Sequence, residues 1–293
     1  MALMPYAARS TATSRFLQEL SPFLFGVAAF VWLFWSPLVG TVRLWLTSPE
    51  AGHGLLLVPV AGWLAWRRGV RPNAVAQPLV GSVLIAAAVG LRYIAALAAE
   101  SFLERISLVG ALAGLVVFSW GVRQLAHWWL PGLLCFLSVP LPEVVIGTLA
   151  LPLQLEASEL GAALLSWRGL PVRLDGNVIR LPGHELFVTE ACSGLRSLTA
   201  LLSLGVLLGG VMLRSVFSRV TLVVLALPVG VLLNGFRVFL TGFLVVFVDP
   251  ALADGFTHMT EGWLLFLVAF AILSAVAWGL ASAERRWRRA RSR

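Results

Sequence analysis

The sequence is short of charge, and it contains no lysine. Charged residues make up 12% of its 293 positions, about half the share of an ordinary soluble domain, whereas 59% of the side chains are hydrophobic. Together with a mean hydropathy of +0.90, this composition excludes a cytosolic globular enzyme and a disordered chain. It also excludes a nucleic-acid binder with a solvated basic surface, which the net charge of +8 would otherwise suggest. The composition is typical of a polytopic membrane protein.

Cysteine is scarce as well, since only Cys135 and Cys192 occur. Two cysteines cannot form a disulfide framework, and the topology below places these two toward opposite faces of the bilayer. Cys135 follows Leu133 and Leu134 and is interpreted as a packing residue. The histidines are scattered without close pairs, so the spacing of a zinc site is missing. We therefore expect no metal and no cofactor.

Long apolar runs predict an all-α polytopic membrane protein with about eight transmembrane helices, because a spanning helix needs about 20 mainly apolar residues. The candidate spans are Ser21–Val39, Gly54–Trp66, Leu79–Ala98, Ile106–Val122, Trp128–Val145, Leu195–Leu213, Val220–Val248 and Gly262–Ala283. The second span is short and the seventh is long. The chain from 1 to 293 is interpreted as a single integral membrane domain.

The arginines predict the orientation of these spans. With a cytoplasmic N-terminus, 14 of the 22 arginines but only two of the 14 acidic residues fall on the inner side, which gives +12 inside and −4 outside. Positive charge gathers on the cytoplasmic side of membrane proteins. Both termini are therefore predicted to be cytoplasmic, and the Arg-rich tail 284–293 is interpreted as an anchor that contacts anionic lipid.

Residues 149–190 predict an extracytoplasmic insertion. Leu149–Trp167 has apolar residues at helical spacing with Glu156 and Glu159 among them, which indicates an interfacial amphipathic helix. From Gly169 to Glu190, strand-forming residues alternate with the turn signals Asp-Gly and Pro-Gly. This pattern predicts a small β-hairpin or three-stranded patch that leads directly into the next motif.

The segment TEACSGLRSL, residues 189–198, changes the chain from predicted strand to membrane helix. Cys192 and Ser193 lie at the helix start, where backbone N–H groups lack intrahelical partners and the helix dipole lowers the pKa of a thiol. Gly194 permits the close approach of another chain or a substrate. An isolated Cys in a membrane protein is usually a packing residue. The polar neighbours of Cys192 at the outer interface nevertheless favour a nucleophile.

The seventh span carries Asn234, Arg237 and Thr241, whose spacing places them on one helix face. Counted from Val220 at about 1.5 Å per residue, Arg237 lies about 25 Å along the helix, in its outer half. Such an Arg could extend to the outer headgroups. The apolar stretch that follows Arg237 disfavours this extension to the headgroups, so we expect a functional Arg that faces the bundle interior.

His258 precedes the last span on the predicted outer side, and its unperturbed pKa suits proton transfer near neutrality. A lone interfacial His is more often a solvated or capping residue. Together with Cys192 and Arg237, however, it would support acyl transfer: a thiolate attacks a peptide carbonyl, a guanidinium stabilises the oxyanion and an imidazole relays a proton to the leaving amine. Of the remaining histidines, His53 and His184 could compete for the base role. His127 is predicted to be cytoplasmic.

Taken in order, these motifs resemble the exosortase family of bacterial membrane transpeptidase-like proteases, which is related to the archaeosortases. The resemblance rests on EACSGLRSL at 190–198, NGFRV at 234–238 and His258 at the start of the last helix. Gly52-His53-Gly54 and the segment 171–183 reinforce it. One departure is Gly52, where many relatives are expected to carry Ser.

The resemblance implies that Cys192 is the nucleophile, Arg237 the oxyanion-binding or substrate-orienting group and His258 the acid/base. The supporting residues are Glu190, Ser193, Gly194, Arg196, Asn234 and His53. The implied partners are the lipid bilayer and membrane-anchored proteins with a C-terminal sorting signal, which consists of a Pro-Glu-Pro motif, a membrane helix and an Arg-rich tail. Cleavage at the periplasmic face of the bacterial inner membrane would release such a protein or transfer it to a glycan-linked acceptor, in connection with exopolysaccharide production. No nucleic acid is implied.

Two alternatives stay open at this point. Arg237 could pair with the acidic residue of the sorting motif instead of the oxyanion. The chain could also be a transporter or a polysaccharide-assembly channel without covalent chemistry. The polar face of the seventh span and the abundant Gly and Pro support this alternative. Transporters usually show internal repeats and a midplane site, and the sequence shows neither.

Overall fold

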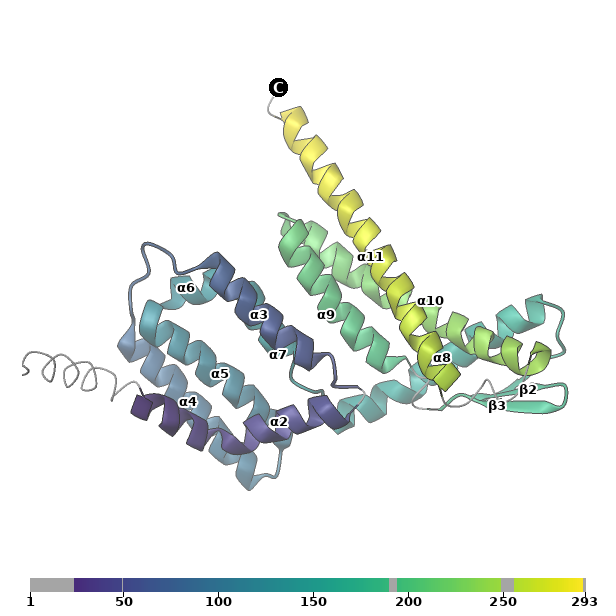
Figure 1. Ribbon diagram of the computed structural model, residues 1–293, viewed down its shortest axis with the longest axis horizontal. Coiled ribbons are helices and arrows are strands. Elements are labelled where there is room, and N and C mark those ends of the chain that lie inside the picture. Colours follow the sequence, from purple (N-terminus) through teal and green to yellow (C-terminus); the bar gives the residue numbers. More distant parts are fainter. Residues whose placement is uncertain (1–23, 49, 190–193, 249–255, 292–293) are drawn as a thin grey trace, which may run out of the picture.

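The computed structural model describes residues 24–48, 50–189, 194–248 and 256–291, with side chains in the last stretch from position 262 onward. The helices are α2 (Trp35–Thr47), α3 (Gly54–Arg68), α4 (Pro78–Leu97), α5 (Ser101–Trp120), α6 (Val122–His127), α7 (Trp129–Leu137), α8 (Glu143–Trp167), α9 (Leu195–Met212), α10 (Val216–Phe247) and α11 (Phe256–Arg291). A small sheet of β1 (Arg173–Asp175), β2 (Val178–Leu181) and β3 (His184–Phe187) lies between α8 and α9 in the chain. Figure 1 shows α2–α7 on one side and α8–α11 with the sheet on the other.

The described residues contain five helices that are long and apolar enough to cross a membrane: α4, α5, α9, α10 and the part of α11 from Gly262. A sixth span results if Leu24–Leu33 and α2, which meet at a bend of 66°, are taken as one. The chain is therefore a multi-pass membrane protein, as predicted. The expected count of eight spans is not confirmed.

Two of the eight predicted spans account for the difference between eight and six. The predicted span 54–66 is α3, whose 15 residues are about 22 Å long and fall short of a hydrocarbon core of about 30 Å. The predicted span 128–145 is divided, because α7 ends at Leu137 and α8 begins only at Glu143. Pro140 and Pro142 lie in this break, and proline lacks the N–H that would continue a helix.

Basic residues from three segments meet at one end of the bundle. The guanidinium groups of Arg68 and Arg219 lie 5.8 and 4.8 Å from the ring centre of Trp129. Arg68 also donates a hydrogen bond to the carbonyl of His127 at 3.1 Å. The ends of α3, α6 and α10 that the arginine pattern predicts to be cytoplasmic thus lie together.

The predicted insertion has the expected elements. Helix α8 begins six residues before the predicted Leu149 and packs along α10, with Gly161 against Val238 and Gly235 against Leu160. The three strands form an antiparallel meander in the order β1-β2-β3. Ile179 and Leu181 of the sheet are buried against α8 and α10, so that the sheet covers the C-terminal parts of these two helices.

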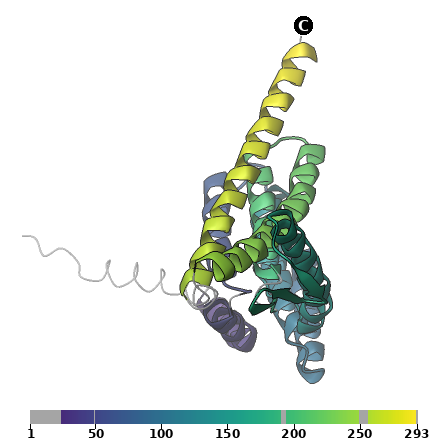
Figure 2. The same ribbon diagram turned by 90° about the vertical axis from the view of Figure 1, so that its right-hand side faces the viewer.

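Helices α9, α10 and α11 share an apolar core in which Leu201, Leu222 and Leu273 are at most 1% exposed. The last helix continues through the predicted tail as far as Arg291, and Figure 2 shows this end of α11 rising beyond the other helices. Glu284 fixes α11 to its neighbours, because its carboxylate accepts hydrogen bonds from the backbone N–H groups of Arg214 and Ser215 at 3.1 and 3.0 Å. These two residues directly precede α10.

Candidate active site

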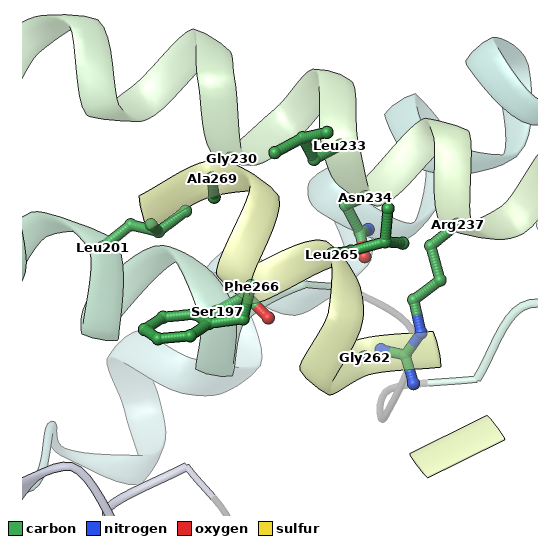
Figure 3. A pocket seen from close by; sticks show the side chains of 10 residues that line it. All are labelled: Ser197, Leu201, Gly230, Leu233, Asn234, Arg237, Gly262, Leu265, Phe266 and Ala269. Atoms are coloured by element: carbon green, nitrogen blue, oxygen red, sulfur yellow. The ribbon is translucent and has the colours of Figure 1, made fainter. Parts of the chain in front are cut away.

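A small pocket lies where α9, α10 and α11 meet, at the end of the three-helix core nearest the sheet. Figure 3 shows the side chains that line it. They come from all three helices: Ser197 and Leu201 of α9, Gly230, Leu233, Asn234 and Arg237 of α10, and Gly262, Leu265, Phe266 and Ala269 of α11. Two residues expected at the site from the sequence, Asn234 and Arg237, are therefore on the pocket wall.

Asn234 connects α10 with the segment that carries the predicted nucleophile. Gly194 precedes the first residue of α9 and has a φ of +76°, and a Cβ at this position would lie 2.5 Å from Cγ of Asn234. Only glycine combines this backbone conformation with such a close approach. The Asn234 side chain is 8% exposed. The carboxamide therefore lies directly against the backbone two residues after position 192.

Arg237 connects α10 with α11. Its guanidinium lies beside Gly262, where a Cβ would be 3.5 Å from Nη2 and 3.6 Å from Cζ, as Figure 3 shows. The backbone carbonyl of Arg237 accepts a hydrogen bond from the Thr241 hydroxyl at 3.0 Å. The Arg237 side chain is half-buried among the three helices, as the sequence predicts, and it points along the pocket wall instead of away from the bundle.

The predicted catalytic triad is described only in part. Cys192 and its neighbours Glu190 and Ser193 lie outside the described residues. His258 belongs to the first turn of α11, four residues and thus about 6 Å of helix before Gly262, and its side chain also lies outside the described part. The described contacts bring together Gly194, Asn234, Arg237 and Gly262, which come from the three segments that carry the triad.

The chain that enters this site is held in place before the nucleophile. Val188 is 2% exposed, and its N–H donates to the carbonyl of Asn177 at 2.9 Å. The Asn177 side chain donates in turn to the carbonyl of Val188 at 3.1 Å and to Gln154 of α8 at 3.5 Å. The sheet and α8 thus fix one end of the segment 189–193, and Gly194 against Asn234 fixes the other.

Arg196 and His53 belong to the rim of this region instead of the pocket. Arg196 is half exposed, with its Nη2 4.0 Å from a carboxylate oxygen of Glu50. His53 comes directly before α3, and its Nε2 donates to the carbonyl of Leu137 at 3.3 Å. Burial lowers the pKa of His53, so this imidazole stays neutral at pH 7. Its contact with α7 indicates a packing role.

The other two histidines and Cys135 lie away from the pocket. His184 begins β3 at the turn, four strand residues before Val188 and thus about 14 Å from it. His127 lies at the basic end, with Nε2 3.5 Å from the carbonyl of Arg68. Cys135 is a free cysteine packed against the core of α3 and α7, in agreement with its interpretation as a packing residue.

Of the ten pocket residues, sequence reasoning named only Asn234 and Arg237, and two of those it missed, Ser197 and Gly262, lie beside the polar groups. Ser197 lies in the first turn of α9, three residues after Gly194, and lines the pocket with Asn234 and Arg237. Its signal was a hydroxyl within the Cys192 motif, in the first turn of the helix that follows. The sequence around Gly262 does not indicate a role in the pocket, because its contact with Arg237 of another helix is visible only in three dimensions.

The described part of the site has the features of a binding site for an oxyanion or another anionic group. A guanidinium, a carboxamide and a hydroxyl line one pocket among otherwise apolar helices. Such donors stabilise negative charge far better in a water-poor site than in water. Among the described residues there is no cluster of three or more metal-ligating side chains.

These features define a multi-pass membrane protein whose polar pocket lies among its last three long helices. The sequence model of the transmembrane exosortase family matches residues 45–275 of the chain, which includes every described pocket residue. The chain therefore belongs to the transmembrane exosortase family. Neither the curated proteins nor the solved structures contain a significant match.

Proposed function

We propose that this exosortase is a cysteine endopeptidase or transpeptidase in which Cys192 is the nucleophile, Arg237 the oxyanion-binding or substrate-orienting group and His258 the acid/base. The observation that carries the proposal is the pair of glycine contacts, Gly194 with Asn234 and Gly262 with Arg237. They join the three segments that bear the triad at one level of the bundle. Because two residues span at most about 7 Å, a nucleophile at position 192 stays close to Asn234.

The chemistry follows from the residue types. The Cys192 thiolate would attack the substrate carbonyl and form a C–S bond, while Arg237 stabilises the oxyanion. His258 would then protonate the amine as the C–N bond breaks, which leaves a thioester on Cys192. Water or an amine would next attack the thioester carbonyl, lose its proton to the imidazole and release the thiolate. The first nucleophile gives hydrolysis, and the second gives transfer.

The substrates proposed from the family resemblance are secreted proteins with a Pro-Glu-Pro motif, a membrane helix and an Arg-rich tail at the C-terminus. The cluster of Arg68, Arg219 and His127 at the opposite end of the bundle from the pocket supports a cytoplasmic location for that end. The pocket would then face the periplasm of the inner membrane. A link to exopolysaccharide production and a glycan-linked acceptor belong to the same proposal.

The alternative of a transporter or channel has less support. Directly below the pocket, the described parts of α9, α10 and α11 pack together through leucine and alanine side chains, and Leu222, Ala226 and Leu273 have no measurable exposure. A passage for a polar solute would need a hydrated path through this core. The pocket instead has a closed apolar end, as expected for a site that works from one side of the membrane.

The decisive experiment is the Cys192→Ala variant, co-expressed with a substrate that carries the sorting signal. We expect the variant to insert in the membrane in normal amounts and to accumulate the uncleaved substrate, as seen by mass spectrometry of the substrate C-terminus. Cys135→Ala is the matched control, because its thiol packs against α3 and α7; this variant should process normally. Normal processing by Cys192→Ala would refute the proposal.

The base is identified by a second pair of variants. His258→Ala should slow cleavage, because proton transfer by a positioned side chain contributes about 10²- to 10⁴-fold to the rate. His184→Ala should have little effect, since its strand places it far from Val188. A loss confined to His184→Ala would assign the base role to the sheet instead of α11.

A further inference from the structure

The pocket has a polar end and an apolar end. Ser197, Asn234 and Arg237 form its polar mouth, and one helical turn deeper Leu201 and Ala269 close it, each 1% exposed. Figure 3 shows Leu201 and Ala269 at one end and Arg237 with Gly262 at the other. About 20 Å³ of the pocket is open to the centre of a water-sized sphere.

This space limits the size of the group that can enter. A cavity holds one water molecule when about 10–15 Å³ is open to the centre of a water-sized sphere, so 20 Å³ accommodates one group about the size of a methyl or a hydroxyl. The apolar floor has no partner for a charged group, whose burial without a partner is costly. A basic side chain would also meet the guanidinium of Arg237 at the mouth.

We infer, on the basis of the proposed peptidase function, that this pocket is the specificity pocket of the enzyme and that it selects substrates with glycine, alanine or serine at the residue that supplies the cleaved carbonyl. The donors at the mouth hold the carbonyl oxygen of this residue. The side chain branches from the adjacent Cα and enters the apolar part, whose walls include Leu233 of α10 and Leu265 of α11. Leu233 and Gly262 are thus residues that determine specificity.

The test uses a co-expressed substrate in which one residue is varied. Mass spectrometry of the released protein identifies its new C-terminal residue, and this position is then changed to Gly, Ala, Ser, Val and Leu. We expect wild-type enzyme to process the Gly, Ala and Ser forms and to cleave the Leu form at least about 10-fold more slowly, since one methylene in such a pocket changes the rate by about 10- to 200-fold.

Two enzyme variants change the pocket in opposite directions. Leu233→Ala enlarges it and should reduce the preference for Ala over Leu by about 10-fold. Leu232→Ala is the matched control, because that side chain is 59% exposed on another face of α10; it should leave the preference unchanged. Gly262→Ala narrows the mouth by an ordinary contact of 3.5 Å with Arg237, and it should disfavour the Ser form relative to the Gly form.

The outcomes separate this inference from the proposed function. Equal cleavage of the Ala and Leu forms by wild-type enzyme overturns the inference and leaves the peptidase intact. The inference is also overturned, with the peptidase left intact, if both Leu233→Ala and Gly262→Ala keep the substrate preferences of wild type. This comparison requires that the variants insert in the membrane and melt like wild type. If the wild-type enzyme cleaves none of the five forms, nor the unmodified substrate, the proposed function fails and the inference with it.

Discussion

The contact between Gly194 and Asn234 makes the sharpest prediction about how the site is assembled. Replacing Gly194 with alanine has two costs that the structure separates. The backbone cost arises because φ is +76°, where a residue with a Cβ is strained by about 1–2 kcal/mol. The packing cost arises because the new Cβ would lie 2.5 Å from Cγ of Asn234, and overpacking of this kind costs about 1–3 kcal/mol.

Gly183 provides a matched control for the backbone cost. It has a φ of +77°, and an added Cβ would have no neighbour within 4 Å. Gly183→Ala should therefore lower the free energy of unfolding by about 1–2 kcal/mol. Gly194→Ala should lower it by about 2–5 kcal/mol, the two costs together, and should also displace the nucleophile segment and slow cleavage.

A double variant isolates the packing cost. Asn234→Ala removes the side chain that the new Cβ meets, so Gly194→Ala/Asn234→Ala should be more stable than the sum of the single variants by about 1–3 kcal/mol. The measurements are thermal unfolding in detergent and the cleavage rate in membranes. Two results would refute the reasoning: equal losses in Gly183→Ala and Gly194→Ala, or a double variant whose loss is the plain sum.

Three further predictions concern other parts of the chain. Arg237→Lys should lower kcat by about 100-fold, because a point charge does not replace a planar fork of donors, while Arg173→Lys on the exposed strand β1 should not; near-normal turnover of Arg237→Lys would show that charge alone suffices. Glu284→Gln should destabilise the protein by about 1 kcal/mol in thermal unfolding, since a charged cap at the start of α10 becomes neutral, and a loss no larger than that of Glu185→Gln, a surface ion pair, would contradict it. The lowered pKa of His53 means that the unfolded chain binds a proton first as the pH falls, so stability should decrease below about pH 6.5; His53→Gln should flatten this part of the pH profile, and an unchanged profile would count against it.

Much of the fold could be predicted from local signals. The sheet follows from two turn signals between strand-forming residues, and the structure has its turns at those places, with Asp175 opposite Val178 and Leu181 opposite His184. The five confirmed spans follow from apolar runs long enough to cross the hydrocarbon core. The count of eight is not confirmed, because hydropathy sums apolar residues without regard to their continuity. It passed over the prolines before α8, and it counted as a span the short helix α3, whose apolar residues pack against α7.

The candidate site could be predicted in part, because part of it depends on the spacing of residues within one helix. Asn234 and Arg237 are three residues apart on a helix, so their common face is a matter of local geometry, and both line the pocket. His53 and Arg196 were also expected at the site, and the structure gives them partners at its rim, Leu137 and Glu50. Ser197 was missed because α9 carries several hydroxyl side chains, Ser197, Thr199 and Ser203, and their spacing does not show which of them faces the pocket.

Local sequence patterns predict that this chain lies in a membrane, where its long helices and its small sheet occur, and which polar residues share a helix face. Each of these properties depends on neighbours a few positions apart. The way in which α9, α10 and α11 cross is visible only in three dimensions. That crossing places Gly194 against Asn234 and Gly262 against Arg237 and encloses a pocket with a polar mouth and an apolar floor. These two contacts join residues that are 40 and 25 positions apart, and they arise from the close packing of side chains on three helices, which a local sequence pattern does not contain.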